Sequence, residues 1–589
     1  MREQTDWWEG SRFPVDGKAV SIILNEIAVM MELLGENPFK VNAYYTAART
    51  VELLKEDLGE LAGEDQLRHI KGIGSSLAKQ IGEILHTGTS QFYQELRAKI
   101  PYGLFALTRI SGLGPKKISL LHKQLGISDV DRLEEACRKN KLLELPGFGA
   151  KTQENILKGI AGLRKYTGQH LFVNVWGLAE NLEKELKKHP HVRDALLAGS
   201  LRRRKEVVKD IDILVSSDNP EEVAEYFAGL PQVETVVGSG PTKTSVVLHQ
   251  GIQADLRIVE QGEFPYALHH FTGSQEHNIA MRHRAKKMGL KMNEYGLFDA
   301  QGKKIMCQSE KEIFRTLGLD NIPPELRENM GEIEAAEQGK LPCLVELKDI
   351  KGVFHIHTVY SDGTASIREM VEETRRRGWN YLGISDHSQS AFYANGLKVE
   401  QINKQLAEID RLNEENPDFT IFKGIEADIR KDGSLDYPDE ILAQFDFVIA
   451  SIHSGFKMTE EEATERLIKA MQNPYTTMLG HPTGRILLGR EGYPVSMKAM
   501  IEAARDCHVI IELNASPYRL DLDWRWCRYA KELGVKIALN PDAHHLAEFD
   551  HMEAGIGAAR KGWLEAFDVF NTRPREQVKD YLRLRKGPK

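Results

Sequence analysis

The sequence predicts a chain of several domains, with a helical first third, an α+β middle part and an α/β part at the end. Its 589 residues are more than one hydrophobic core usually holds. Apolar residues recur at helical spacing in the first third, whereas short apolar strands alternate with amphipathic helices towards the end. Between these last two parts, Leu317–Leu347 is rich in Pro, Glu and Gly and predicts a linker with at most one helical turn.

Composition limits the kinds of partner. Charged residues make up 28% of the chain and the formal net charge is -8, which excludes a generally basic coat for nucleic acid. Binding to DNA would have to use local basic patches, backbone amides and metal ions. No apolar run reaches the roughly 20 residues that span a bilayer, and the five cysteines form no CxxC pair. We therefore expect a cytoplasmic protein with reduced thiols and no membrane partner.

The first third is predicted to be helical over Lys18–Leu34, Asn42–Asp57 and Leu77–Leu85. It also repeats a Gly-x-Gly motif that precedes a helix and is followed by lysine. A Gly-x-Gly turn at the start of a helix exposes backbone N–H groups to a phosphate, and glycine permits the close approach. We expect contacts to a phosphate backbone at the three glycine pairs, Gly72 and Gly74, Gly112 and Gly114, and Gly147 and Gly149.

In the middle part the pattern changes to strands with alternating apolar residues. The helix that follows them is predicted over Glu276–Met288. The predicted strands are Ala195–Leu197, Ile211–Val215, Thr244–Leu248 and Gln253–Val259.

Three carboxylates in this part indicate a metal site. Asp210 and Asp212 are two residues apart on a predicted strand, so their side chains share one face, and Asp255 lies on another strand. Carboxylates this close repel one another unless a cation holds them, and hard oxygen ligands suit Mg²⁺ or Mn²⁺. Before the pair, Gly199 and Ser200 offer a tight turn with donors. Arg202 and Arg203 offer positive charge to a triphosphate.

The last part alternates strands and helices, which predicts a parallel sheet or an α/β barrel. The predicted strands are Gly352–His355, Tyr381–Ile384, Thr420–Gly424, Phe447–Ala450, Thr477–Leu479, Val509–Glu512 and Val535–Leu539. The predicted helices are Ser366–Arg377, Glu400–Asn413, Thr459–Met471, Met497–Asp506 and Asp523–Leu533.

Histidines and acids follow the ends of most of these strands. Side chains at the carboxyl ends of parallel strands converge on one mouth. A single histidine there is more often packed or hydrogen-bonded, but a mixed N/O set of this size can complete three sites for zinc, manganese or iron. The predicted ligands are His355, His357, Asp362, His387, Glu426, His453, His481, Asp542 and His544.

The Gly-Ser, Asp-x-Asp and third Asp resemble the nucleotidyltransferase superfamily. With Phe271-Thr272-Gly273-Ser274 and the following helix, residues 18–318 resemble family X DNA polymerases, the class of DNA polymerase beta. The glycine motifs are similar to the helix-hairpin-helix modules of that family, which grip the DNA backbone. The resemblance implies metal binding by Asp210, Asp212 and Asp255, triphosphate contacts by Gly199, Ser200 and Arg203, a sugar site shaped by Phe271, Thr272 and Gly273, and positions near the base pair and template strand for Asn278 and Arg282.

Three positions depart from the family pattern. His270 stands where the vertebrate enzyme has tyrosine, and Lys209 replaces a glycine before the carboxylate pair. Vertebrate relatives form a Schiff base through a lysine after the first glycine motif, and the matching residue here is Gln80. An amide cannot be this nucleophile, and the adjacent Lys79 lies about 100° away around a helix. We expect weak or absent deoxyribose-phosphate lyase activity.

Residues 348–589 resemble PHP domains, metal-dependent phosphoesterases with a distorted (β/α)₇ barrel. Every expected ligand position is present, including His357 and the pair Asp542 and His544. Arg485 and Lys423 could hold a phosphate or could be ordinary surface charges.

Together the resemblances imply a polymerase of the bacterial and archaeal type. It would fill gaps in DNA with deoxynucleoside triphosphates, with a Mn²⁺-favoured 3′→5′ exonuclease and a role in base excision repair. Two alternatives stay open: a PHP domain that is only a metal-stabilised structural module, and a non-catalytic DNA-end binding scaffold. We expect a monomer acting on gapped or nicked DNA. The expected domains are a helical domain at 1–90, a second helical domain at 91–165, the nucleotidyltransferase palm at 166–260, a nucleotide- and template-binding subdomain at 261–318, a linker at 319–347 and the PHP domain at 348–589.

Overall fold

The computed structural model describes residues 17–52, 58, 64–70, 72–87, 90–100, 104, 107–110, 113–166 and 168–585. The chain divides into two compact units, Met1–Gly168 and Gln169–Lys589. Each unit has its own buried core. The two are therefore described separately.

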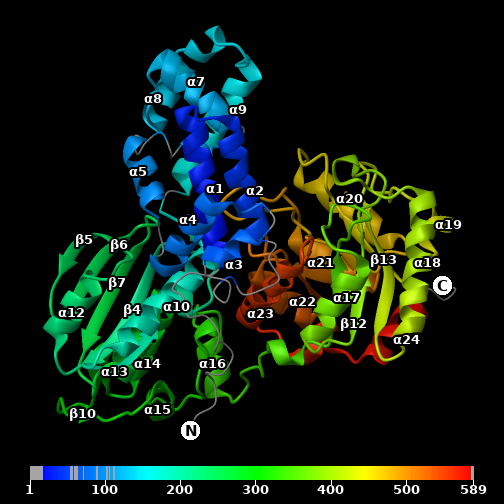
Figure 1. Cartoon of the computed structure of the whole chain (residues 1–589). Coiled ribbons are helices and arrows are strands. Elements are labelled where there is room, and N and C mark those ends of the chain that lie inside the picture. Colours follow the sequence, from blue (N-terminus) through cyan, green and yellow to red (C-terminus); the bar gives the residue numbers. More distant parts are fainter. Residues whose placement is uncertain are drawn as a thin grey trace. The chain divides into compact units, whose positions relative to one another are not determined.

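The first unit is helical in its described part, as the sequence predicts. Its core is a single cluster of buried apolar side chains, including Leu24, Ile81 and Leu121. The end of the predicted helix Asn42–Asp57 lies outside the described residues. The elements are α1 Gly17–Leu34, α2 Pro38–Glu52, α3 Glu64–Arg68, α4 Ser75–Thr87, α5 Gln91–Lys99, η1 Leu107–Arg109, α7 Pro115–Leu125, α8 Val130–Arg138, η2 Lys141–Glu144 and α9 Ala150–Lys165 (Figure 1).

The described glycines of the three motifs lead into helices. Gly74, Gly114 and Gly149 each stand immediately before α4, α7 or α9, and a Cβ at any of the three would meet nothing within 4 Å. The first glycines of two motifs, Gly72 and Gly147, have φ of +95° and +84°, which glycine adopts readily. Gly112 lies outside the described residues. The open space beside the second glycines leaves the backbone accessible to a ligand.

The second unit begins with a five-stranded mixed sheet in the order β2-β4-β7-β6-β5. Helices α10 Phe172–Lys188 and α12 Pro220–Ala228 pack their apolar sides on it, and β1 His170–Leu171 pairs with β3 Val207–Val208 beside it. The four predicted strands are present, and β5 is a strand that was not predicted. The strands are β2 Val192–Leu197, β4 Asp210–Ser217, β5 Val233–Ser239, β6 Lys243–Leu248 and β7 Gln253–Val259.

A smaller subdomain follows the sheet. Its apolar cluster includes Phe314 and Leu317, and residues of the expected linker, such as Ile322 and Ile333, are buried in the same cluster. The segment 319–347 is therefore packed against this subdomain. The elements are α13 Phe264–Thr272, α14 Gln275–Lys287, β8 Lys291–Asn293, β9 Gly296–Phe298, β10 Lys304–Ile305, α15 Glu310–Thr316, η3 Pro324–Leu326 and α16 Glu332–Glu337.

The last part is a parallel sheet of seven strands in chain order, β11 to β17. A parallel bridge between Ile356 and Ala543 joins its two ends, so the sheet nearly closes into a barrel. The predicted (β/α)₇ fold is therefore confirmed. The strands are β11 Gly352–Ile356, β12 Tyr381–Ile384, β13 Thr420–Asp428, β14 Phe447–Ser451, β15 Met478–Leu479, β16 Ile510–Asn514 and β17 Ile537–Asn540.

Aromatic side chains fill the barrel interior. Phe354, Phe422 and Phe447 lie there with Val578 and Leu582 of the last helix, α24 Arg575–Arg585. Open polar space therefore has to lie at the other end, beyond the carboxyl ends of the strands. The helices between the strands pack around the outside (Figure 1), and they are α17 Ile367–Arg376, α18 Val399–Glu415, α19 Asp439–Leu442, α20 Glu460–Gln472, α21 Met497–Asp506, α22 Trp524–Glu532 and α23 His551–Lys561.

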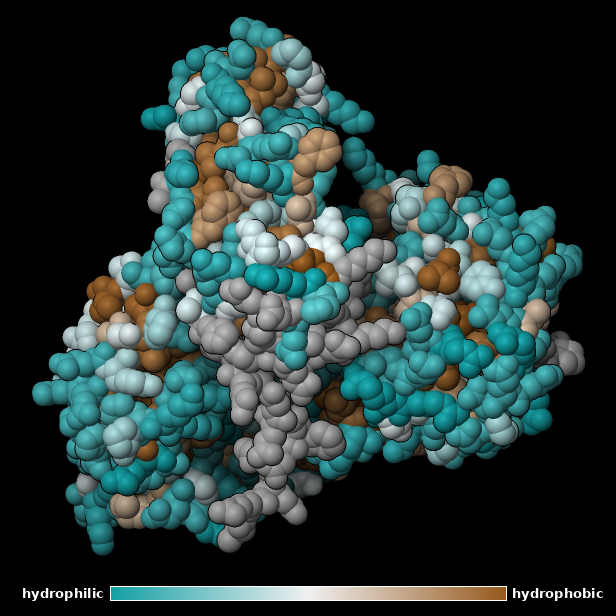
Figure 2. All heavy atoms as spheres, viewed as in Figure 1, coloured by the Kyte–Doolittle hydropathy of each residue, from teal (hydrophilic) through white to brown (hydrophobic). Residues whose placement is uncertain are grey.

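The visible surface is mostly hydrophilic, with apolar residues in small separate groups (Figure 2). Within the described part of the chain, every helix is too short or too polar to cross a bilayer.

Candidate active sites

The first candidate site lies on the five-stranded sheet. Strands β4 and β7 run parallel, with Asp212 opposite Asp255 and Asp210 opposite Gln253. The three predicted carboxylates therefore come from adjacent strands on one face of the sheet. Lys243 of β6 lies 2.7 Å from Asp255 Oδ2 and pairs with it. In the described part of the chain, groups of three or more ligand residues whose ligand atoms all lie within 4.8 Å of one another occur only in the barrel. The carboxylate oxygens of the three aspartates are therefore farther apart than this.

The charges of this site favour a cation. Burial, followed by the charges of Asp210 and Asp255, raises the pKa of Asp212 to about 7. Burial and Asp255 also raise the pKa of Asp210. Burial acts to raise the pKa of Asp255 as well, but hydrogen bonds led by that from Lys243 lower it overall. Two of the three carboxylates thus resist ionisation in the protein alone, as expected where a divalent ion supplies the missing positive charge.

Gly199 is required beside this pair. It begins the short helix α11 Gly199–Arg202 with φ of +58°, and a Cβ placed on it would lie 1.9 Å from Asp212 Oδ2. Its backbone and the carboxylate therefore share a space that no side chain can enter.

A cleft of about 420 Å³ opens in front of the aspartates. Of the predicted site residues, Arg202, Asp255 and Thr272 do not line it. Gln275, the first residue of α14, lines the cleft, and the N-terminal end of a helix suits an anion. Neither Gln275 nor this helix start was singled out from the sequence. The lining residues are Gly199, Ser200, Arg203, Asp210, Asp212, His270, Phe271, Gly273, Gln275, Asn278 and Arg282.

The two arginines before the aspartates differ in their contacts. Arg202 donates to Thr272 Oγ1 at 2.6 Å and pairs with Glu310 at 2.6 Å, so its charge is already neutralised away from the cleft. Arg203 lines the cleft and donates through Nε to Glu328 Oε1 at 3.0 Å. Thr272 is buried and accepts from both arginines, which makes it a support of Arg203.

The residues that depart from the family pattern also have defined places. His270 lines the cleft, and its carbonyl accepts a hydrogen bond from Asn278 at 2.7 Å. In the first unit, Gln80 is buried and donates to the Tyr44 hydroxyl at 2.7 Å, whereas Lys79 is exposed. Gln80 therefore offers no amine, and it is held by a partner of its own.

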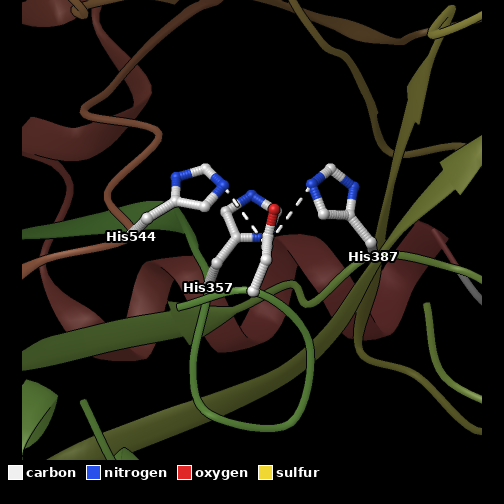
Figure 3. Close-up of side chains that lie close together, drawn as sticks. His357, His387 and His544 are labelled. Carbon is white, nitrogen blue, oxygen red and sulfur yellow. Dashed lines mark ion pairs between the residues drawn. The ribbon is translucent and has the colours of Figure 1, made fainter. Parts of the chain in front are cut away.

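The second candidate site lies at the mouth of the barrel, where all nine predicted ligands come together. They form overlapping groups whose ligand atoms lie within 4.8 Å of one another. Figure 3 shows His357, His387 and His544 turned towards one another, from three separate segments. The four groups are His357 with Asp362, His387 and His544; His355 with His357 and Asp542; His355 with Glu426 and His481; and His387 with Glu426 and His453.

Glu426 is the centre of the barrel site. Its carboxylate is completely buried and lies 3.1 Å from His355 Nε2, 2.8 Å from His387 Nδ1 and 3.2 Å from His453 Nε2. Burial acts against its ionisation, but the surrounding imidazoles hold its pKa well below the ordinary value. It is therefore a permanent anion that several ions could share.

Unsatisfied polar atoms show that these residues fit metal ions. Several of their buried nitrogen and oxygen atoms have no hydrogen-bond partner, including both ring nitrogens of His357, His355 Nε2 and Glu426 Oε2. Buried polar groups are normally paired, so such a group of orphans indicates an absent ligand. His355, His481 and Asp542 also take positive φ, at 60°, 22° and 52°. Backbone strain of this kind costs about 1–3 kcal/mol per residue and gathers at functional sites.

Other residues that the sequence analysis did not select hold these ligands in place. Glu512 accepts from His355 Nδ1 at 2.6 Å and from the His481 backbone at 2.8 Å. Asp428 lies 2.5 Å from His453 Nδ1, leaving Nε2 to face Glu426. A carboxylate that orients an imidazole is a common outer layer of metal sites. The sequence signal that could have identified Glu512 and Asp428 is an acidic residue at the end of an otherwise apolar strand.

The sequence left open whether Arg485 and Lys423 hold a phosphate or are ordinary charges, and their ion pairs favour the second. Arg485 pairs with Asp523 at 2.5 Å and Lys423 with Asp410 at 2.5 Å, so neither is available to a phosphate. Arg519 instead lies 3.6 Å from Asp542 Oδ2, with its side chain 23% exposed.

The two sites define a class: a nucleotidyltransferase joined in one chain to a PHP-type phosphoesterase. Family models match residues 18–90 (helix-hairpin-helix domain), 105–161 (SAM-like helix-hairpin-helix tandem), 267–328 (DNA polymerase beta thumb) and 354–516 (PHP domain). The chain is 41% identical to the DNA polymerase/3′-5′ exonuclease PolX of Bacillus subtilis (strain 168), over 96% of this chain and 99% of that protein. The chain therefore belongs to the family X DNA polymerases that carry a PHP domain, and it is an enzyme.

Other relatives match part of the chain. A probable phosphatase of Caldanaerobacter subterraneus subsp. tengcongensis is 31% identical, over 39% of this chain and 89% of its own length. A crystal structure of Leishmania infantum polymerase beta, as a ternary P/T complex, covers 38% of this chain and 96% of its own, with 23% identity. The TM-score of this match is 0.26.

Proposed function

We propose that the first site is a template-directed DNA polymerase that fills short gaps with deoxynucleoside triphosphates. The cleft carries this proposal, because it unites Asp210 and Asp212 with the cations Arg203 and Arg282 in a space of nucleotide size. Arg203 binds the triphosphate, while Phe271 and Gly273 form the wall beside the sugar. Asp210, Asp212 and Asp255 would hold Mg²⁺ or Mn²⁺, which when bound favours the ionised 3′-hydroxyl and neutralises the pyrophosphate that leaves.

The second site is a 3′→5′ exonuclease in this proposal. Its nine residues would hold up to three ions, Mn²⁺, Zn²⁺ or Fe²⁺, which when bound make water nucleophilic near neutral pH. Glu426 shares its charge among the imidazoles, Glu512 and Asp428 orient His355 and His453, and Arg519 attracts the phosphodiester. The similarity to a probable phosphatase supports related 3′-end or abasic-site processing.

The substrate is gapped or nicked DNA, and the setting is base excision repair in the cytoplasm. The helix-hairpin-helix turns support this, since Gly74, Gly114 and Gly149 leave backbone N–H groups accessible beside lysines. The protein acts as a monomer with the domain limits expected from the sequence, except that residues 319–347 pack with the subdomain before them. One site adds nucleotides and the other removes faulty 3′ ends.

A gapped primer assay in Mn²⁺ tests this proposal. With all four deoxynucleotides the labelled primer should lengthen to fill the gap, and without them it should shorten from its 3′ end. If the primer is not shortened in Mn²⁺, Zn²⁺ or Fe²⁺, the result would favour a PHP domain with only a structural role. Failure to lengthen the primer would favour the DNA-end binding scaffold.

A further inference from the structure

Two aromatic side chains are exposed together beside the barrel mouth. Phe392 is 85% exposed and Tyr393 is 69% exposed, in the short helix η5 Phe392–Ala394. The residues around them, Ala391, Ala394 and Leu397, are completely buried. The backbone is therefore anchored on both sides while the two aromatic rings face solvent.

This loop is well fixed. Leu397 N donates to His387 O at 2.8 Å, and Gly396 N donates to Ala391 O at 3.0 Å. A Cβ on Gly396 would lie 1.9 Å from Ser388 O, so the backbone at Gly396 packs against the backbone at Ser388 at a distance that only glycine allows. Such a loop holds the backbone of both aromatic residues in place, which lowers the entropy lost when a ligand stacks on their rings.

One of the two rings stands next to a metal ligand. The ring of Tyr393 lies 6.2 Å from that of His387, centroid to centroid. Arg519 lies beside Asp542, which belongs to a ligand group that shares His357 with a group of His387, and there it can attract a phosphate. An unpaired nucleotide offers both matching parts, a flat base for stacking and a phosphodiester for the arginine and the ligands.

We infer that Phe392 and Tyr393 form a stacking platform for the unpaired bases at the 3′ end of single-stranded DNA. The platform holds the terminal nucleotides so that the last phosphodiester lies over the ligands. This inference rests on the proposed exonuclease and names the form of DNA that its site takes. A double-stranded end has to unpair before its bases reach the rings.

A comparison of two strands tests the platform. One oligonucleotide carries normal 3′-terminal nucleotides and the other carries tetrahydrofuran abasic residues there. The wild type should cleave the normal strand with a KM about 10-fold lower, because stacking contributes at that scale. The Phe392→Ala/Tyr393→Ala variant should lose this preference, and its KM for both oligonucleotides should equal the wild-type KM for the abasic one. The Phe392→Trp/Tyr393→Trp variant should keep the preference for the normal oligonucleotide.

A matched control is Phe567→Ala. Phe567 is 80% exposed, and its carbonyl accepts from Lys536, which precedes β17 at the other end of the barrel. This variant should keep the wild-type preference. The inference is overturned if the double alanine variant keeps the preference, or if it slows on both strands equally. Wild-type protein that cleaves neither strand would instead overturn the proposed exonuclease.

A second, independent observation concerns a buried lysine of the PHP domain. The side chain of Lys561, at the end of α23, is 0% exposed. Its Nζ lies 2.5 Å from Glu328 Oε1 and donates to the carbonyls of Arg203 at 3.1 Å and Glu325 at 3.3 Å. A buried ammonium is stable only with such a complete set of partners.

These partners are also the supports of the polymerase cleft. The Glu328 oxygen that binds Lys561 accepts from Arg203 Nε at 3.0 Å, and Arg203 lines the cleft. Lys561 thus fixes Arg203 twice, through the backbone carbonyl and through the shared carboxylate. The geometry points to Lys561 as a positioning residue for the nucleotide site, so that the PHP domain completes the polymerase. This inference rests on the proposed role of Arg203.

Single-nucleotide incorporation tests this role. Lys561→Met should raise the KM for the incoming nucleotide about 10-fold, as expected for a lost charged hydrogen bond, with kcat within threefold. Glu328→Gln should act in the same direction and serves if Lys561→Met does not fold. Exonuclease activity should be unchanged in both.

Arg560→Met is the matched control, because Arg560 binds Glu325 at 2.8 Å across the same interface without contacting Arg203. It should keep the wild-type KM. The inference is overturned if both test variants keep the wild-type KM, or if Arg560→Met raises it equally. If Arg203→Ala itself leaves the KM unchanged, the proposed triphosphate contact is wrong.

Discussion

Replacing Gly199 by alanine should disable the polymerase site alone. The added Cβ would lie 1.9 Å from Asp212 Oδ2, whereas ordinary contacts begin at 3.4 Å, so the carboxylate has to move by about 1.5 Å. The positive φ of 58° adds backbone strain. Since a displacement of about 1 Å at a reacting centre can cost on the order of 100-fold in rate, we expect a loss of kcat of at least that size.

The assay is single-nucleotide gap filling, with exonuclease activity measured on the same preparation. Gly177→Ala is the matched control, because Gly177 lies in α10 of the same domain and a Cβ there meets nothing within 4 Å. That variant should keep wild-type activity. Gap filling by Gly199→Ala within about threefold of wild type would refute the reasoning, since Asp212 could then not be a fixed ligand.

Three further predictions concern single residues. Glu310→Gln should destabilise the fold by about 3 kcal/mol at pH 7, because it leaves Arg327 buried without its anion. Burial opposes ionisation of Glu310, but Arg327 and Arg202 hold its pKa well below the ordinary 4.5. The stabilisation is therefore complete above pH 4.5, declines as the pH falls below it and is lost only as the pH passes through the lowered pKa. Urea unfolding should show the difference between the variant and wild type narrowing from about pH 5 to pH 3 without vanishing. Glu426→Gln should lower bound metal, measured by mass spectrometry, and slow the exonuclease by at least about 100-fold while gap filling persists; full metal content would contradict the shared role of Glu426. Borohydride should trap no adduct of the wild type with abasic-site DNA, because Gln80 has no amine; a trapped adduct would show that another amine serves.

Much of the fold follows from the sequence because strands with apolar residues on both faces are easy to recognise. The seven barrel strands are of this kind, as Ile510–Asn514 illustrates, being buried throughout. Strand β5 was missed because Val233–Ser239 is exposed along most of its length, and its apolar residues do not alternate with polar ones. Residues 319–347 were expected to be a linker for a similar reason. Ile322 and Ile333 are isolated apolar residues in the sequence, and they are buried only by the subdomain beside them.

The sites follow from the sequence where one residue type recurs at one structural position. His355 and Glu426 were found because histidines and acids end successive strands, and Asp210 and Asp212 because their spacing puts them on one face. Contacts between residues far apart in the chain leave no recurring pattern in the sequence. Lys561 and Arg203 are 358 residues apart, and only the folded chain shows that they meet. Phe392 and Tyr393 were not selected, because a sequence does not show which aromatic residues stay exposed.

We propose that the chain contains two independent metal-dependent sites, one that extends DNA and one that shortens it. The most direct measurement compares Asp210→Ala and His355→Ala on one gapped, 5′-labelled primer in Mn²⁺, with and without deoxynucleotides. Asp210→Ala should shorten the primer at the wild-type rate and never lengthen it, whereas His355→Ala should lengthen it and never shorten it. If either substitution removed both activities, the two sites would not be independent.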